Sequence, residues 1–142
     1  ALFSKLAKLK NLNLYCNKLT HIEDSLFDHL CSLENLFLTD NKIQSINEKT
    51  FAKLAKLQSL GLTKNCLKRI ENQPFKNLSN LTLLAFSSNE LEELNADAFD
   101  GLYDNLELLD LSGNKIKQIQ PNSLNQFKRL KYLSINEYFI FI

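Results

Sequence analysis

The amino-acid sequence predicts an α/β solenoid: an arc with a parallel concave sheet of about six strands and irregular convex loops. The 142 residues include 30 Leu and 17 Asn but no Val, Met or Trp, which indicates one short pattern repeated many times. Large aliphatic residues recur every 24 positions, and within each repeat they alternate with polar ones. These observations make a conventional mixed fold unlikely and favour stacked coils in one domain over residues 1–142.

The repeated unit follows the pattern L-x-x-L-x-L-x-x-N-x-L-x-x-I-x-x-x-x-F-x-x-L. Successive units begin at Leu9, Leu33, Leu57, Leu81, Leu106 and Leu130. The fifth unit departs from the pattern, since it has Leu124 and Phe127 where the others have Phe and Leu. One extra residue also precedes it, within 103–105, and we expect this insertion to enlarge the convex loop without breaking the sheet.

Each unit contains one short strand, because its L-x-L core has a period of two. In the first unit Leu12 and Leu14 point inward, while Asn11, Asn13 and Tyr15 point outward. Equivalent strands are expected over 35–39, 59–63, 83–87, 108–112 and 132–136. Each strand can pair only with the strand of the next unit, so the sheet is parallel with a rise of ~4.8 Å per unit.

Two further columns are expected to hold the units together. The Asn after each strand lies where the chain turns, and its amide can satisfy backbone groups of its own and the neighbouring turn. This column contains Asn17, Asn41, Asn65, Asn89 and Asn114. The Phe residues stack nearer the convex side, and their column contains Phe27, Phe51, Phe75 and Phe99, with Phe3 at its start.

On these residues the chain resembles the leucine-rich repeat family, specifically its 24-residue "typical" class. The resemblance covers nearly the whole chain and implies similarity to ectodomains of Toll-type receptors, proteoglycans and variable lymphocyte receptors. The cysteine-rich end caps of that family are missing here. The chain starts within a unit at Ala1 and ends in the apolar run Tyr138–Ile142, so we expect a fragment of a longer array.

The three cysteines match neither a cap nor a metal-ligand spacing. Stacking places Cys16 and Cys66 two strands apart, near ~10 Å, whereas a disulfide requires Cα atoms within about 7 Å. Cys31 is expected on the far side of its coil from Cys16. The sequence therefore predicts three free thiols that act as small buried hydrophobic residues.

Two overlapping acceptor motifs for N-glycosylation begin at Asn77 and Asn80. Together with the family resemblance they favour an extracellular location, either secreted or in the ectodomain of a membrane protein. Unpaired thiols argue against that location.

The net charge and the sequence motifs argue against several classes of function. A formal net charge of +1 argues against a phosphate-binding surface, so no nucleic-acid partner is expected. The longest apolar run has five residues, too short for a bilayer span of roughly 20, so no direct membrane insertion is expected.

We find no phosphate loop, metal motif or catalytic constellation, and the isolated His21 and His29 suit exposed loops. The sequence predicts neither an enzyme nor a cofactor.

Eight carboxylates gather near the fourth unit with no Lys or Arg among them. They belong to Glu90, Glu92, Glu93, Asp97, Asp100, Asp104, Glu107 and Asp110. This acidic belt is either a solvated surface or a docking strip for a basic partner.

The outward positions of the strands form three lanes on the concave face, and most of their side chains are small and uncharged. Exposed apolar side chains among them are candidate anchors for a ligand. The predicted binding residues are Tyr15, Phe37, Thr39, Thr63, Leu83, Leu108, Asp110 and Tyr132.

The sequence therefore favours a non-enzymatic protein-recognition module of an extracellular receptor, adhesion or innate-immune protein. Its partner would be a protein ligand or a neighbouring protein domain. One alternative is an assembly module that joins copies or domains through its apolar ends or its convex face, with oligomerisation through the uncapped ends. Another is an intracellular scaffold. The assignment to immunity or adhesion rests on the family resemblance alone.

Overall fold

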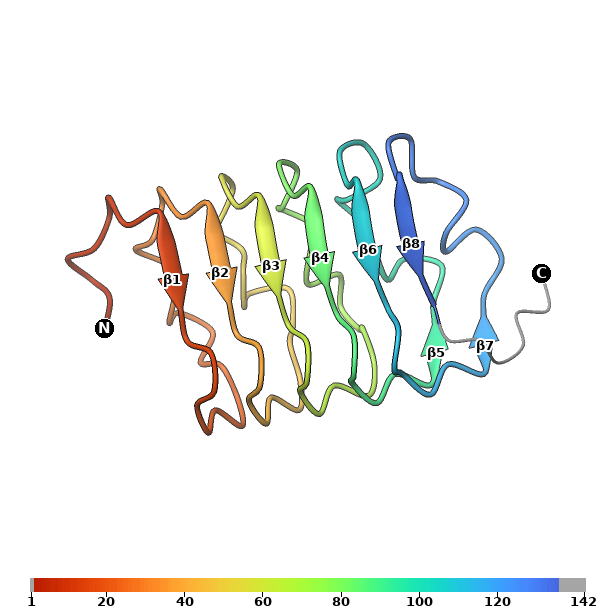
Figure 1. Cartoon of the computed structure of the whole chain (residues 1–142). Coiled ribbons are helices and arrows are strands. Elements are labelled where there is room, and N and C mark those ends of the chain that lie inside the picture. Colours follow the sequence, from red (N-terminus) through yellow and green to blue (C-terminus); the bar gives the residue numbers. More distant parts are fainter. Residues whose placement is uncertain (1, 136–142) are drawn as a thin grey trace.

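The computed structural model describes residues 2–135 and shows a solenoid of stacked coils (Figure 1). Six short strands form one parallel sheet in the order β1-β2-β3-β4-β6-β8. Their bounds are β1 Asn11–Asn13, β2 Asn35–Phe37, β3 Ser59–Gly61, β4 Leu83–Ala85, β6 Leu108–Asp110 and β8 Tyr132–Ser134. The predicted arc with a six-stranded parallel sheet is confirmed, and residues 2–135 form no helix.

The strand register follows the predicted lanes. Asn11 pairs with Asn35, and the same lane continues through Ser59, Leu83, Leu108 and Tyr132. The insertion before the fifth unit leaves this register intact, as expected, because β4 pairs directly with β6. A second parallel pair, β5 Glu93–Leu94 with β7 Gln118–Ile119, lies beyond the sheet and was not predicted.

The core is a layer of Leu, Ile and Phe side chains between the sheet and the convex segments. Phe27, Phe51, Phe75 and Phe99 are 1% exposed or less. Consecutive rings from Phe3 to Phe99 stack with centroids 6.3–6.5 Å apart. Strands in a sheet lie only about 4.8 Å apart, so the wider ring spacing places the Phe column on the outside of the curve and the sheet on the inside.

The Asn column is confirmed as a ladder between coils. The Asn65 amide donates to the carbonyls of Leu38 and Leu62 at 3.0 and 3.1 Å, while its Oδ1 accepts the Ile43 N–H at 3.0 Å. Asn41 and Asn89 repeat this arrangement. Since an unpaired buried backbone group costs roughly 1–3 kcal/mol, each interior Asn stabilises three such groups at once.

The residue before each column Asn has a left-handed backbone, which was not predicted. Its φ is 56° at Cys16, 58° at Asp40, 54° at Lys64, 54° at Ser88 and 65° at Gly113. Glycine alone adopts this conformation without steric cost, and it occurs at only one of these five turns. The turn geometry is therefore set by the stacked coils rather than by the local residue.

The aromatic packing of the fifth coil differs from that of the regular coils, because its sequence departs from the repeat pattern. Phe127 occupies the Leu position of its unit, and its ring contacts Phe99 and Tyr103 with centroids 5.7 and 5.1 Å away. The Tyr103 hydroxyl donates to the Ala96 carbonyl at 3.1 Å. Burial, followed by the nearby Asp100 and Asp97, raises the pKa of Tyr103 to about 12. The inserted segment thus supplies an aromatic side chain where the regular Phe is missing.

The cysteines correct one prediction. All three are free, but Cys16 and Cys31 are exposed and Cys66 is half-buried, so the prediction of small buried hydrophobic residues is wrong. Cys16 occupies the left-handed turn after β1, and Cys31 lies in the turn before β2, where the chain returns to the sheet. The predicted apolar run Tyr138–Ile142 lies outside the described residues.

Candidate ligand-binding face

The concave face presents a nearly uncharged surface built from alternate residues of the six strands. Of the outward residues of these strands, Asp110 alone carries a charge. Its Oδ1 accepts hydrogen bonds from the Ser112 N–H and hydroxyl at 3.0 and 2.6 Å, so this carboxylate is engaged in a local turn. Charged pairs lie at the rim instead, as in Lys10 with Glu34 at 2.9 Å.

Apart from Asp110, the structure divides the predicted binding residues into two groups. Leu83, Leu108 and Tyr132 are register neighbours and form a continuous apolar lane over β4, β6 and β8. Tyr15, Phe37, Thr39 and Thr63 gather over β1 to β3, at or just beyond the strand ends. Tyr15, Phe37 and Tyr132 are 54%, 39% and 67% exposed, so aromatic side chains are accessible in both groups.

Gly61 lies on the candidate face but was not among the predicted binding residues. It pairs with Phe37, and a Cβ built on Gly61 would lie 3.1 Å from Phe37 Cδ1 and 3.2 Å from Thr39 Oγ1. The Phe37 ring therefore lies against bare backbone of β3, in a position that any larger residue at 61 would crowd. A glycine inside a predicted strand is the signal that could have indicated this close approach.

Hydrogen bonds between coils fix the polar residues of this face. The Asn35 amide donates to Asn11 Oδ1 at 2.6 Å, and the hydroxyls of Thr63 and Ser87 lie 3.1 Å apart. These contacts order the side chains before a ligand arrives. Binding to such a surface loses less conformational entropy than binding to mobile side chains.

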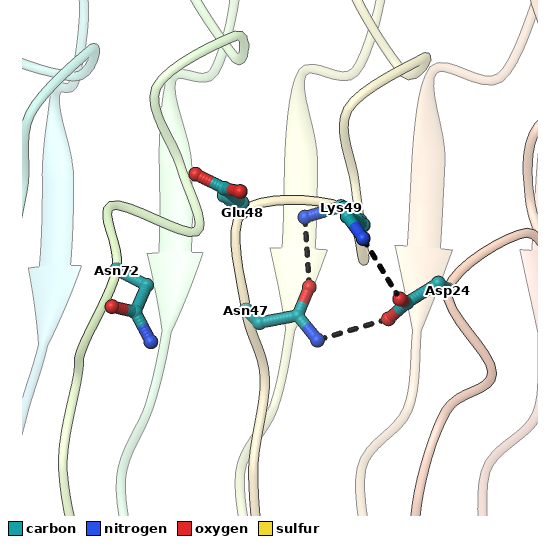
Figure 2. Close-up of a pocket in the computed structure, with 5 residues that line it drawn as sticks. All are labelled: Asp24, Asn47, Glu48, Lys49 and Asn72. Carbon is teal, nitrogen blue, oxygen red and sulfur yellow. Dashed lines mark hydrogen bonds and ion pairs between the residues drawn. The ribbon is translucent and has the colours of Figure 1, made fainter.

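A hollow on the convex side is a weaker candidate. It has a volume of about 230 Å³ and is lined by Asp24, Asn47, Glu48, Lys49 and Asn72 (Figure 2). The Asn47 amide donates to Asp24 at 2.9 Å, the Lys49 N–H donates to Asn47 at 2.8 Å, and the Lys49 ammonium lies 3.7 Å from Asp24. Three of the five lining residues, Asp24, Asn47 and Lys49, therefore already bond to one another, which reduces what the hollow offers a ligand.

The acidic belt is partly neutralised in space. Glu90, Asp104 and Glu107 form ion pairs with Lys115, Lys128 and Lys131 at 3.4, 2.6 and 2.9 Å. Asp100 accepts a hydrogen bond from the Gln73 amide at 3.0 Å. The belt contains no base along the sequence because its bases come from the following coils, which weakens its interpretation as a docking strip.

Neither a metal centre nor a membrane segment emerges from the part of the chain that the structure describes. Within residues 2–135 no three His, Cys, Asp or Glu side chains converge as metal ligands would. Over the same residues, no helix has the length and apolarity needed to span a bilayer. The concave face is therefore the best-formed candidate site.

Curvature, stacking and an exposed parallel sheet together define a repeat solenoid. Family models described as leucine rich repeat match residues 7–67 and 56–104, and a related one matches residues 105–127. The chain belongs to the leucine-rich repeat family. No curated protein matches the chain.

Among solved structures, the crystal structure of a TLR13-ssRNA13 complex is similar to this chain, with 32% sequence identity and a TM-score of 0.88. The similarity covers 96% of this chain and 20% of the other, so this chain spans about a fifth of that protein. The chain is thus a repeat module similar to part of a Toll-like receptor.

The same comparison corrects the expectation of no nucleic-acid partner. That expectation is wrong as an exclusion, because a similar solenoid is found in complex with single-stranded RNA. Its physical weakness is that a net charge of +1 averages over surfaces that the fold keeps apart.

Proposed function

We propose that the chain is a non-enzymatic recognition module of an extracellular receptor, adhesion or innate-immune protein, and that its concave face binds a protein ligand. The observation that carries this proposal is the nearly uncharged, hydrogen-bonded six-stranded face with accessible Phe37 and Tyr132. Interfaces concentrate their binding energy in a few aromatic anchors on a prearranged surface.

The test is a screen of the fluorescent, multimerised chain against a panel of secreted and cell-surface proteins. The triple variant Phe37→Ala, Leu108→Ala, Tyr132→Ala should bind any recovered ligand at least about tenfold more weakly, since interface anchors contribute more than about 1 kcal/mol each. The matched control Gln44→Ala, Glu71→Ala, Asp97→Ala changes exposed residues away from the sheet and should bind normally. Unchanged affinity in the anchor variant would reject the concave site.

Exposure to the secretory pathway is a separate part of the proposal. Asn77 and Asn80 are exposed, and their amides also donate to the carbonyls of Ala52 and Ala55 at 3.3 and 2.7 Å. Expression through a secretory pathway should give a product whose mass falls on treatment with a glycosidase specific for Asn-linked glycans. Ser79→Ala combined with Thr82→Ala should abolish that shift. A chain secreted without any glycan would favour the intracellular scaffold instead.

We also propose that these coils continue in a longer array. Support comes from the partial coverage of the similar structure and from apolar side chains exposed at both end coils, with Leu2 80% and Leu133 45% exposed. Appending one further coil of the same pattern should raise the midpoint of thermal unfolding. Self-association that persists after this addition would favour the assembly module.

Nucleic-acid binding is the second candidate function. It is supported by the similarity to the TLR13-ssRNA13 complex over 96% of this chain. The outward strand residues of the concave face include no Lys or Arg, so a phosphate backbone would need another surface.

A further inference from the structure

Positive charges predominate on the first segments that lead from the Phe column back to the sheet, and negative charges on a later one. The first four return segments span 4–8, 28–32, 52–56 and 76–80. They contain five lysines, namely Lys5, Lys8, Lys53, Lys56 and Lys76, but a single carboxylate, Asp28. The next return segment carries Asp100 and Asp104 and no base, so the positive region ends there. We call the five lysines the lysine face.

The lysine face is neither buried nor neutralised. All five side chains are exposed, and none forms an ion pair within residues 2–135. By contrast, Lys128 and Lys131 on the later coils are paired with carboxylates of the preceding coil. The lysine face therefore retains its full positive charge toward solvent.

The return segments are held side by side, so these lysines share one edge of the solenoid. Asn77 and Asn80 bond to the carbonyls of Ala52 and Ala55 in the preceding coil, the residues just before Lys53 and Lys56. The Phe rings at the start of each segment are 6.3–6.5 Å apart. Lys5 with Lys8 and Lys53 with Lys56 occupy equivalent positions two coils apart, which extends the charge along the stacking direction.

We propose that the lysine face binds the phosphodiester backbone of a nucleic-acid strand. Ammonium groups on flexible stems act as point charges for phosphates, and such contacts are independent of base sequence. None of the exposed aromatic residues in the described chain lies on these return segments, so the surface offers no stacking platform for bases. This inference rests on the second candidate function and leaves the concave-face proposal untouched.

The test measures binding of a labelled RNA of twenty uridines by fluorescence anisotropy between 50 and 200 mM salt. The chain is produced without glycans, because Asn77 and Asn80 adjoin Lys53 and Lys56. Five contacts predict a slope of log K against log salt of about −3.5, at about −0.7 per contact. Lys53→Gln with Lys56→Gln should lower the magnitude of this slope by about 1.4 and weaken binding roughly 20-fold at 0.1 M salt.

The matched control is Lys64→Gln with Lys68→Gln, which removes the same charge from the opposite edge of the third coil. It should stay within about twofold of the parent chain, and thermal melting should show that both variants remain folded. Equal weakening in both double variants would overturn the lysine face while RNA binding itself survives. Absence of any RNA binding at 50 mM salt would overturn both the face and the second candidate function. Binding of a sulfated oligosaccharide that RNA fails to displace would also overturn the proposal.

Discussion

The first and third coils have the same motif but different surroundings. Leu60 and Asn65 in the third coil are 0% and 7% exposed, whereas Leu12 is half-buried and Asn17 is exposed in the first. The third coil lies between two others, while in this chain the first has one neighbour in the sheet. The comparison shows that burial of a motif residue is conferred by the adjacent coils.

The largest difference is expected for the inward Leu. Leu60→Ala removes a fully buried side chain between two coils and should lower the free energy of unfolding by about 2–5 kcal/mol. Leu12→Ala should cost about 1 kcal/mol, because water already reaches this side chain. Chemical denaturation of both variants measures the difference. Equal losses would mean that the neighbouring coil does not determine the contribution of the Leu.

The Asn column provides a second pair of substitutions, one in the third coil and one in the first. Asn65→Ala leaves the buried Ile43 N–H without a partner and removes one of two hydrogen bonds from each of the Leu38 and Leu62 carbonyls, so it should cost about 3 kcal/mol. Asn17→Ala should cost less than about 1 kcal/mol, since among residues 2–135 the Asn17 amide bonds only to Leu14 and Tyr15 of its own coil and water can replace it. Thermal unfolding compares the two. A larger loss at Asn17 would contradict the ladder between coils.

The left-handed turn is occupied by Gly113 in the fifth coil and by Lys64 in the third, so substitutions at these two positions should have opposite effects on stability. Gly113→Ala should destabilise by about 1–2 kcal/mol, because its φ is 65° and the new Cβ would lie 3.0 Å from Ser88 Oγ. Lys64→Gly at the equivalent turn should stabilise by about 0.5–1 kcal/mol, since it relieves the same strain. Melting temperatures that moved in the same direction for both variants would rule out backbone strain at these turns.

Tyr103 lies in the inserted segment before the fifth coil, and the regular coils have no such segment. Its pKa is raised from 10.0 to about 12, so the unfolded chain loses the phenolic proton first as pH rises. The stability linked to Tyr103 is therefore fully present below pH 10 and is lost between about pH 10 and 12. An ultraviolet titration should show a late tyrosinate step that Tyr103→Phe removes. Persistence of that step in the variant would assign it to another tyrosine.

The sequence predicted the fold well because the repeat specifies each layer independently of distant contacts. Periodicity alone placed Leu60, Asn65 and Phe75 on the correct faces. Features that depend on what lies one coil away were missed, such as the approach of Phe37 to Gly61 and the pairing of Glu107 with Lys131. The exclusion of nucleic acid failed for the same reason, since net charge is independent of where a side chain lies, whereas binding depends on it.

Hydrogen exchange tests most directly whether each coil is held in place by its neighbours. The amides of Leu19, Ile43, Leu67 and Leu91 each donate to the Asn Oδ1 of the following coil at 3.0–3.1 Å, so their local hydrogen bonds are equivalent. We predict that Leu19 in the first coil exchanges fastest and that Ile43 and Leu67 are the most protected. If Leu19 were as protected as Leu67, the motif itself and not the neighbouring coils would hold each unit in place.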